Sequence, residues 1–158
     1  MEDTIFALAT ARGKAGVAII RISGPNARAV LAALGGQAPP ARASRLSVLR
    51  DATGDVLDHA LILHFSEGAS FTGEDVVELH LHGSTAIIRA VSAEIEHTGL
   101  ARMAGPGEFT RRALMNERLD LTQVQGLADV RLRASRLRAR PHRRSQSPLP
   151  AAPSRGSA

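Results

Sequence analysis

The stretch that most constrains the fold is residues 71–83, where apolar and polar side chains alternate between two turn signals. Thr72-Gly73 opens the stretch and Gly83-Ser84 closes it. A period of two predicts a strand with one apolar face and one mostly polar face. The ionisable side chains predicted to share the polar face are Glu74, Glu78, His80 and His82. A helix is predicted directly afterwards, and a charged strand end beside a helix N-terminus is a common place for a ligand.

The composition narrows the class of protein. The 158 residues suffice for one domain with a hydrophobic core. The lack of cysteine excludes a disulfide framework, a thiolate metal site and a cysteine nucleophile. The chain has no Trp or Tyr, which disfavours recognition of single-stranded RNA by base stacking. No secretory signal is evident and no apolar stretch approaches the ~20 residues of a membrane span, so we expect a soluble cytoplasmic protein with no membrane partner.

The pattern along the chain predicts a mixed α/β (α+β) fold, in which a sheet with antiparallel hairpins is flanked by helices. Besides the opening stretch, strands are predicted over residues 4–9, 17–23, 45–50, 56–65 and 100–103. The third and fourth of these surround a short glycine turn, which indicates an antiparallel hairpin. Helices are predicted after Gly24-Pro25, over residues 85–98 with Ser84 as the cap, and from Glu108 to Asn116.

Two groups of polar residues admit more than one interpretation. Arg21 interrupts an apolar strand, so it either extends to water at a sheet edge or faces a cleft or a partner. His80 and His82 could hold a metal ion with a third ligand, but residues of this kind more often line a polar cleft. His59 and His64 are expected to be structural or exposed.

The charges near residue 110 are expected to be structural. Glu108 lies at a predicted helix N-terminus, where the helix dipole accounts for an acid without invoking acid–base chemistry. Arg111 and Arg112 are expected on a solvated helix face or in a dimer contact.

The composition changes abruptly near Val130. Residues 131–158 contain eight Arg and no acid, whereas residues 1–130 contain 12 basic and 15 acidic residues. A capping box at Asp120 and Gln123 predicts a helix over residues 121–130, but the Arg-, Pro- and Ser-rich tail has no core-forming pattern and is predicted to be disordered. Such a tail would bind RNA phosphates without sequence specificity.

Several ordered stretches together resemble the N-terminal domain of the tRNA modification GTPase family MnmE (TrmE). They are Asp3-Thr4-Ile5 and residues 16–24, 70–79, 106–113 and 116–123. The resemblance implies a fold similar to the folate-binding domain of the glycine-cleavage T-protein, over residues 1–120. It implies that the domain forms a homodimer and binds 5-formyltetrahydrofolate or 5,10-methylenetetrahydrofolate, with contacts at Arg21, Glu78 and Arg118. The last position is often Lys in the family.

The resemblance also implies a context for the domain. Full-length family members use GTP, Mg and K, and act with an MnmG-like flavoprotein to place a 5-carboxymethylaminomethyl group on the wobble uridine of tRNA. This sequence contains no GxxxxGK[ST] motif, and the match stops near Val130. We therefore expect a truncated chain in which residues 121–130 begin a helical domain and residues 131–158 arise from a frameshift.

The alternatives that remain are a non-functional product of a broken gene and non-specific RNA binding through the tail. Whether the chain alone is an enzyme stays open. The helix over residues 121–130 would lack its partner, so marginal stability or aggregation is expected.

Overall fold

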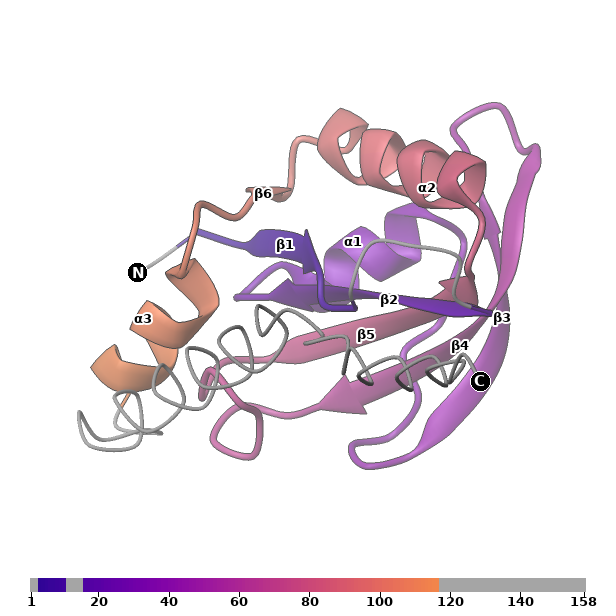
Figure 1. Ribbon diagram of the computed structural model, residues 1–158. Coiled ribbons are helices and arrows are strands. Elements are labelled where there is room, and N and C mark those ends of the chain that lie inside the picture. Colours follow the sequence, from indigo (N-terminus) through magenta and orange to yellow (C-terminus); the bar gives the residue numbers. More distant parts are fainter. Residues whose placement is uncertain (1–2, 11–15, 117–158) are drawn as a thin grey trace, which may run out of the picture. The chain divides into compact units, whose positions relative to one another are not determined.

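The computed structural model describes residues 3–10 and 16–116 as a six-stranded mixed sheet with three helices (Figure 1). All of these residues lie in the first of the two units into which the chain divides, residues 1–124. The strands are β1 (Ile5–Leu8), β2 (Val17–Ser23), β3 (Ser44–Arg50), β4 (Val56–Phe65), β5 (Val76–His82) and β6 (Arg102–Met103). The helices are α1 (Ala27–Ala33), α2 (Thr85–His97) and α3 (Glu108–Met115). The mixed α/β fold class is thus confirmed.

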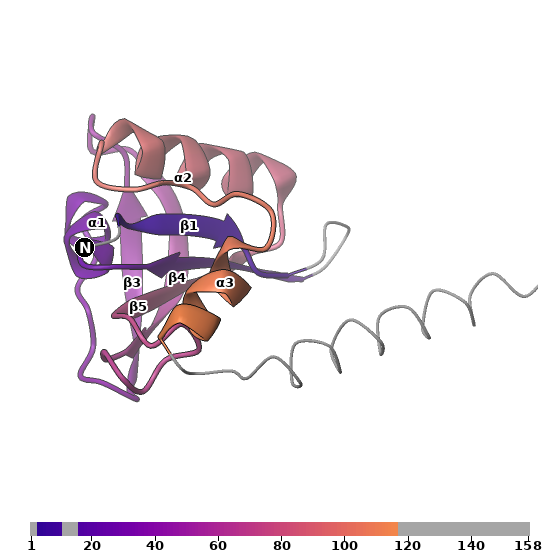
Figure 2. The same ribbon diagram turned by 90° about the vertical axis from the view of Figure 1, so that its left-hand side faces the viewer.

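The stretch with the alternating pattern forms β5, an interior strand of the sheet. The strand order is β3-β4-β5-β2-β1-β6 (Figure 1), and the pairs are antiparallel except for β1 with β6. Figure 2 shows the sheet after a quarter turn, with α2 above β1 and α3 below it. The predicted β3–β4 hairpin is confirmed. Because β5 has a neighbour on each side, its side chains lie at the centre of both faces of the sheet.

One face of the sheet is covered by α1 and α2. The apolar side chains of β5 point to this face, together with Phe6, Ile20 and Ile62 from the neighbouring strands. Helix α2 contributes Val91 and Ile95, which are fully buried, whereas the predicted stripe residue Ile88 is half-buried. This continuous apolar layer fixes the register, since a shift of one residue would turn every β5 side chain to the opposite face.

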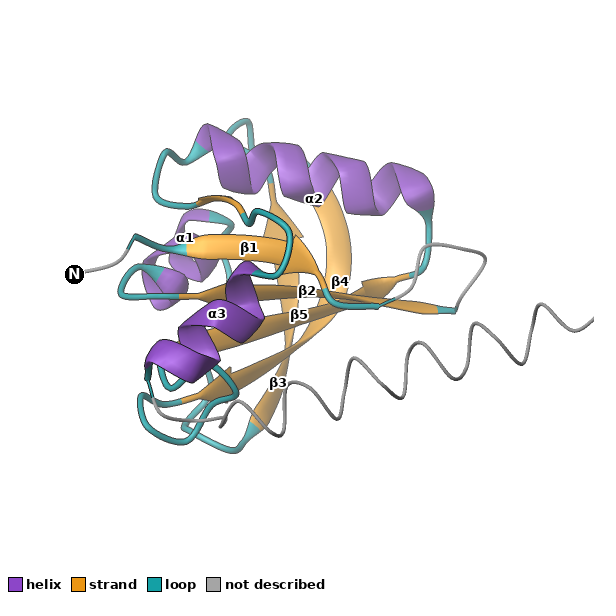
Figure 3. Ribbon diagram, turned by 60° about the vertical axis from the view of Figure 1, so that its left-hand side comes forward, coloured by secondary structure: helices purple, strands orange, loops and turns teal. Residues whose placement is uncertain are grey.

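The other face, which we call the open face, carries the polar side chains of β5. Helix α3 lies on the opposite side of β1 and β2 from α2 (Figure 3). Two rows of register partners cross the open face. The first row is Ser44, Leu63, Glu78, Arg21 and Ala7. The second row is Leu46, Leu61, His80 and Ile19. A charged row therefore lies beside a mostly apolar row.

Two turns require glycine. Gly24 has a φ of 135°, and a Cβ there would lie 2.7 Å from the Cα of Thr4. Gly99 has a φ of 69° and ends α2 as predicted. At the other end of α2, Ser84 occupies the N-cap position, but its side chain makes no capping hydrogen bond, so that part of the prediction is wrong.

Several predictions fall on residues that the structure does not describe. They are the contact at Arg118, the helix over residues 121–130 and the tail over residues 131–158. Within residues 3–10 and 16–116, no helix has both the length and the hydrophobicity that a bilayer span requires.

Candidate functional site

Arg21 and Glu78 form an ion pair at the centre of the open face. They are register partners on β2 and β5, so the antiparallel pairing itself places their side chains together. The Arg21 Nε and Nη2 atoms donate to Glu78 Oε2 at 2.9 and 2.8 Å. The Arg21 side chain is 31% exposed and that of Glu78 is 12% exposed. The structure thus brings together two of the three predicted folate contacts, on a surface that a ligand can reach.

His80 completes this cluster, which we call the Arg21 cluster: Arg21, Glu78 and His80. Its Nε2 atom lies 3.3 Å from Glu78 Oε1, and its side chain is 22% exposed. The two carboxylate oxygens therefore have different partners, a cation with two donors on Oε2 and one imidazole nitrogen on Oε1. A carboxylate at a half-open surface can accept paired N–H groups from a planar ligand.

The other predicted polar side chains of the stretch have separate partners. His82 directs its Nδ1 atom to Asp58 Oδ1 at 2.8 Å, and its backbone N–H donates to Asp58 Oδ2 at 2.9 Å. Glu74 lies in the turn before β5 rather than in the strand, and its carboxylate accepts a hydrogen bond from Ser23, on the face of β2 that also carries Arg21. Gly73 adopts a φ of 81° in this turn, a conformation that favours glycine, and β5 begins after it.

Histidines elsewhere are structural or exposed, as predicted. His64 is buried, with Nε2 2.7 Å from Asp75 Oδ1 and Nδ1 3.2 Å from the Pro39 carbonyl oxygen, while His59 is exposed. In the described part of the chain, no three or more His, Cys, Asp and Glu side chains are arranged to hold a metal ion.

A second charged cluster, the Arg112 cluster, lies between α3, the turn before β5 and the N-terminal segment. Its members are Asp3, Glu74, Arg102, Glu108 and Arg112. The Arg112 guanidinium pairs with three carboxylates, on Asp3 at 2.9 Å, Glu74 at 3.1 Å and Glu108 at 3.3 Å. The Arg112 side chain is only 1% exposed, so the expectation of a solvated or dimer-contact residue is wrong.

Hydrogen bonds connect the Arg112 cluster to the sheet. Ser23 Oγ donates to Glu74 Oε2 at 2.6 Å and lies 2.7 Å from Thr72 Oγ1. Asn116 Nδ2 donates to the Thr72 carbonyl oxygen at 2.8 Å. Sequence reasoning missed these contacts because they join segments far apart in the chain. One signal was available, since Glu108 and Arg112 are four residues apart and lie on one face of a helix.

Within the Arg112 cluster, arginines stabilise the ionised carboxylates. Hydrogen bonds from Arg102, above all, lower the pKa of Glu108 to about 2, against the opposing effect of burial. The hydrogen bond from Arg102 also lowers the pKa of Asp3. Glu108 thus remains a charged structural group, in agreement with the interpretation from sequence.

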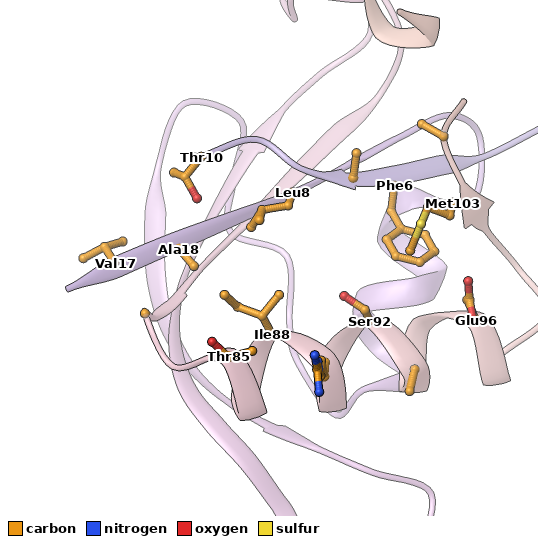
Figure 4. Close-up of a pocket in the computed structure, with 15 residues that line it drawn as sticks. Phe6, Leu8, Thr10, Val17, Ala18, Thr85, Ile88, Ser92, Glu96 and Met103 are labelled. Atoms are coloured by element: carbon orange, nitrogen blue, oxygen red, sulfur yellow. The ribbon is translucent and has the colours of Figure 1, made fainter. Parts of the chain in front are cut away.

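A groove lies on the helix-covered side of the sheet, between α2 and β1–β2 (Figure 4). Its volume is about 800 Å³, and Phe6, Leu8 and Ile88 form part of its apolar lining. Ser92 and Glu96 line it from α2. Because Arg21 and Glu78 point to the opposite face, the groove and the Arg21 cluster are two separate candidate sites.

Comparison with known proteins identifies relatives of the chain. The family model described as "GTP-binding protein TrmE N-terminus" matches residues 4–118. The protein named "tRNA modification GTPase MnmE" of Ruegeria sp. (strain TM1040) is 59% identical over 128 residues, which cover 81% of this chain and 30% of that protein. The protein of the same name from Jannaschia sp. (strain CCS1) is 61% identical over 125 residues.

A protein of that name from Caulobacter vibrioides is 49% identical over 130 residues, which cover 82% of this chain and 29% of that protein. The chain therefore spans about 30% of the length of these curated relatives. The resemblance inferred from sequence motifs is confirmed over the part of the chain that includes both Arg21 and Glu78.

Proposed function

The chain belongs to the family described as "GTP-binding protein TrmE N-terminus", and from this premise we propose that the domain binds a tetrahydrofolate that carries a one-carbon group. The 5-formyl and 5,10-methylene forms are the two candidates. The ligand would lie on the open face, at the Arg21 cluster. The observation that carries the proposal is the pair of half-buried Arg21 and largely buried Glu78, which the β2–β5 register places opposite each other.

The chemistry of the open face matches that of a folate. A pterin has neighbouring N–H donors that one carboxylate can accept as a pair, and Glu78 presents a carboxylate there. The carboxylates and carbonyl groups of the rest of the molecule suit cations such as Arg21. The adjoining row, which includes Leu61 and Ile19, offers apolar contact to the ring system.

Isothermal titration calorimetry with 5-formyltetrahydrofolate tests this assignment. We expect Glu78→Gln to weaken binding roughly 10- to 100-fold, because a charge-assisted hydrogen bond contributes about 1.5–3 kcal/mol. Ser92→Phe serves as the matched control, since it fills the groove beside α2 without changing the open face. Loss of binding in Ser92→Phe but not in Glu78→Gln would place the ligand in the groove and overturn the assignment.

We further propose that the domain forms a homodimer through the open face. Leu46 and Leu61 are register partners there and are 78% and 36% exposed. Exposed apolar side chains that adjoin one another favour a protein contact. Sedimentation equilibrium should show a dimer in the wild type and a shift toward monomer in Leu46→Lys. An unchanged dimer in that variant would exclude this face as the interface.

In the longer proteins of the family, this domain would act in tRNA modification. The relatives carry the name "tRNA modification GTPase", and we extend to this chain a role in wobble-uridine modification beside an MnmG-like flavoprotein. GTP, Mg and K would belong to the rest of such a protein. Replacing the N-terminal domain of a full-length relative with residues 1–118 of this chain should preserve tRNA modification, measured by mass spectrometry of tRNA nucleosides. Glu78→Gln in that chimera should reduce it.

A further inference from the structure

The two oxygens of Glu78 are held unequally. Oε2 accepts two hydrogen bonds from Arg21, whereas Oε1 has His80 Nε2 at 3.3 Å. That contact is longer than the usual 2.7–2.9 Å of a charge-assisted hydrogen bond. The His80 side chain is 22% exposed whereas that of Glu78 is 12% exposed, so a ligand would reach Oε1 by displacing the imidazole.

We propose that His80 regulates ligand binding on the open face by competing for Glu78 Oε1. This inference rests on the proposed function, because it requires a ligand that donates N–H groups to Glu78. A pair of neighbouring donors needs acceptor capacity on both carboxylate oxygens. Arg21 holds Oε2 through two short contacts, so Oε1, where the His80 contact is longer, is the oxygen that a ligand can take more easily. Protonated His80 competes strongly because it donates a charge-assisted bond, whereas neutral His80 competes weakly.

The surroundings of His80 favour a response that comes from this residue. Its register partners are apolar, Ile19 on β2 and Leu61 on β4. On the described strands β2, β4 and β5, the charged and titratable groups of this face are Glu78, Arg21, His82 and His59. Of these, His82 is bound to Asp58 and His59 is exposed on β4. Glu74, paired with Arg112 of α3, adjoins the same face at Ser23. Glu78 is therefore the carboxylate that the His80 charge affects most directly.

The direction of the pH effect follows from the competition. Histidine ordinarily changes charge between pH 5 and 8, and acid favours the form that holds Oε1. Ligand binding should therefore release a proton, and its apparent affinity should fall as the pH falls.

The experiment is a titration of the full chain with 5-formyltetrahydrofolate at pH 8.0, 6.5 and 5.5. The variants are His80→Gln, which keeps a donor of similar size without a charge change, and His59→Gln as a matched exposed control. We expect about a tenfold loss of affinity on acidification in the wild type and in His59→Gln, and less than about twofold in His80→Gln. At pH 5.5, His80→Gln should bind more tightly than the wild type.

A wild-type pH dependence that persists in His80→Gln would overturn the role of His80 and leave the proposed function intact. No binding by the wild type at any of these pH values would instead overturn the proposed function, and the role of His80 with it. A second measurement uses the wild type alone, so it does not depend on the variant folding. Calorimetry at pH 6.5 in phosphate and in Tris should give different binding enthalpies, because the released proton passes to the buffer. Equal enthalpies would contradict the proposal.

Discussion

The Arg21 cluster and the Arg112 cluster contain the same kinds of charged side chain, but their two arginines differ in how far they are exposed to solvent. In each, an arginine pairs with a glutamate from the β5 region, Glu78 in one and Glu74 in the other. Arg112 is 1% exposed and pairs with three carboxylates, whereas Arg21 is 31% exposed and pairs with one. At the centre of the Arg112 cluster, Arg112 and Glu108 are buried and tie α3 to the turn before β5, whereas Asp3 and Arg102 lie at its exposed edge. The Arg21 cluster contributes less to the fold and has capacity left for binding.

The largest expected effect is that of Arg112→Met on stability. The substitution keeps the apolar stem but leaves the half-buried Glu74 without its cation and removes one partner from the buried Glu108. Removal of one partner from a buried ion pair costs about 3–5 kcal/mol. Urea unfolding followed by circular dichroism should show this loss, or a chain that does not fold. A variant with the wild-type midpoint would show that the Arg112 cluster is not a structural clamp.

The second largest effect is expected from acid, which should lower the stability that the Arg112 cluster gives the folded chain. Because the pKa of Glu108 is lowered in the folded state to about 2, the unfolded state binds protons first as the pH falls. The stabilisation from ionised Glu108 is therefore complete above about pH 4.5 and disappears as the pH approaches 2. Urea midpoints measured from pH 5 to pH 2.5 should fall more steeply in the wild type than in Glu108→Gln. Parallel curves would contradict a charged role for Glu108.

Part of the Arg21 cluster could be predicted from the sequence, because alternation along one strand depends only on neighbouring residues. Alternation along β5 places Glu78 and His80 on one face, and the arginine in β2 is the one polar interruption of an apolar strand. The antiparallel pairing of β2 with β5, which brings Arg21 to Glu78 across 57 residues of sequence, was not predicted, and the grouping of these two residues came from the family resemblance. Period and residue type were enough to predict which side chains face the open side.

The contacts of the Arg112 cluster could not be predicted from strand alternation. Its residues come from the N-terminal segment, a turn, a short strand and a helix, so the contacts depend on how these segments pack. Arg112 lies four residues after Glu108, but that spacing does not distinguish a buried pair from a solvated one. The pair that Arg112 forms with Asp3, 109 residues away in the sequence, becomes visible only in the folded structure. Arg118 lies outside the described residues, so its role stays a prediction.

A smaller effect is expected for Arg21→Met. The loss of this cation leaves Glu78, whose side chain is 12% exposed, with His80 alone. Because Arg21 itself is 31% exposed and has this one carboxylate partner, the cost should lie between that of a surface pair and that of a buried pair, about 1–3 kcal/mol. The same variant should lose most of its affinity for 5-formyltetrahydrofolate. Chemical unfolding and calorimetry on one preparation check both statements. A stability loss as large as that of Arg112→Met would make the Arg21 cluster a second structural clamp rather than a binding surface.

The smallest effect is expected for Arg111→Met, and it provides the strictest form of the comparison. Arg111 and Arg112 are adjacent on α3, and both pair with Glu108. The Arg111 side chain is 60% exposed and its contact is 3.5 Å long, so solvent already screens it. We expect a change within about 0.5 kcal/mol, and less still in 0.5 M salt. Chain position and residue type are almost the same for the two arginines. A large gap between the two variants would therefore come from burial, whereas equal losses would show that burial does not separate the two clusters.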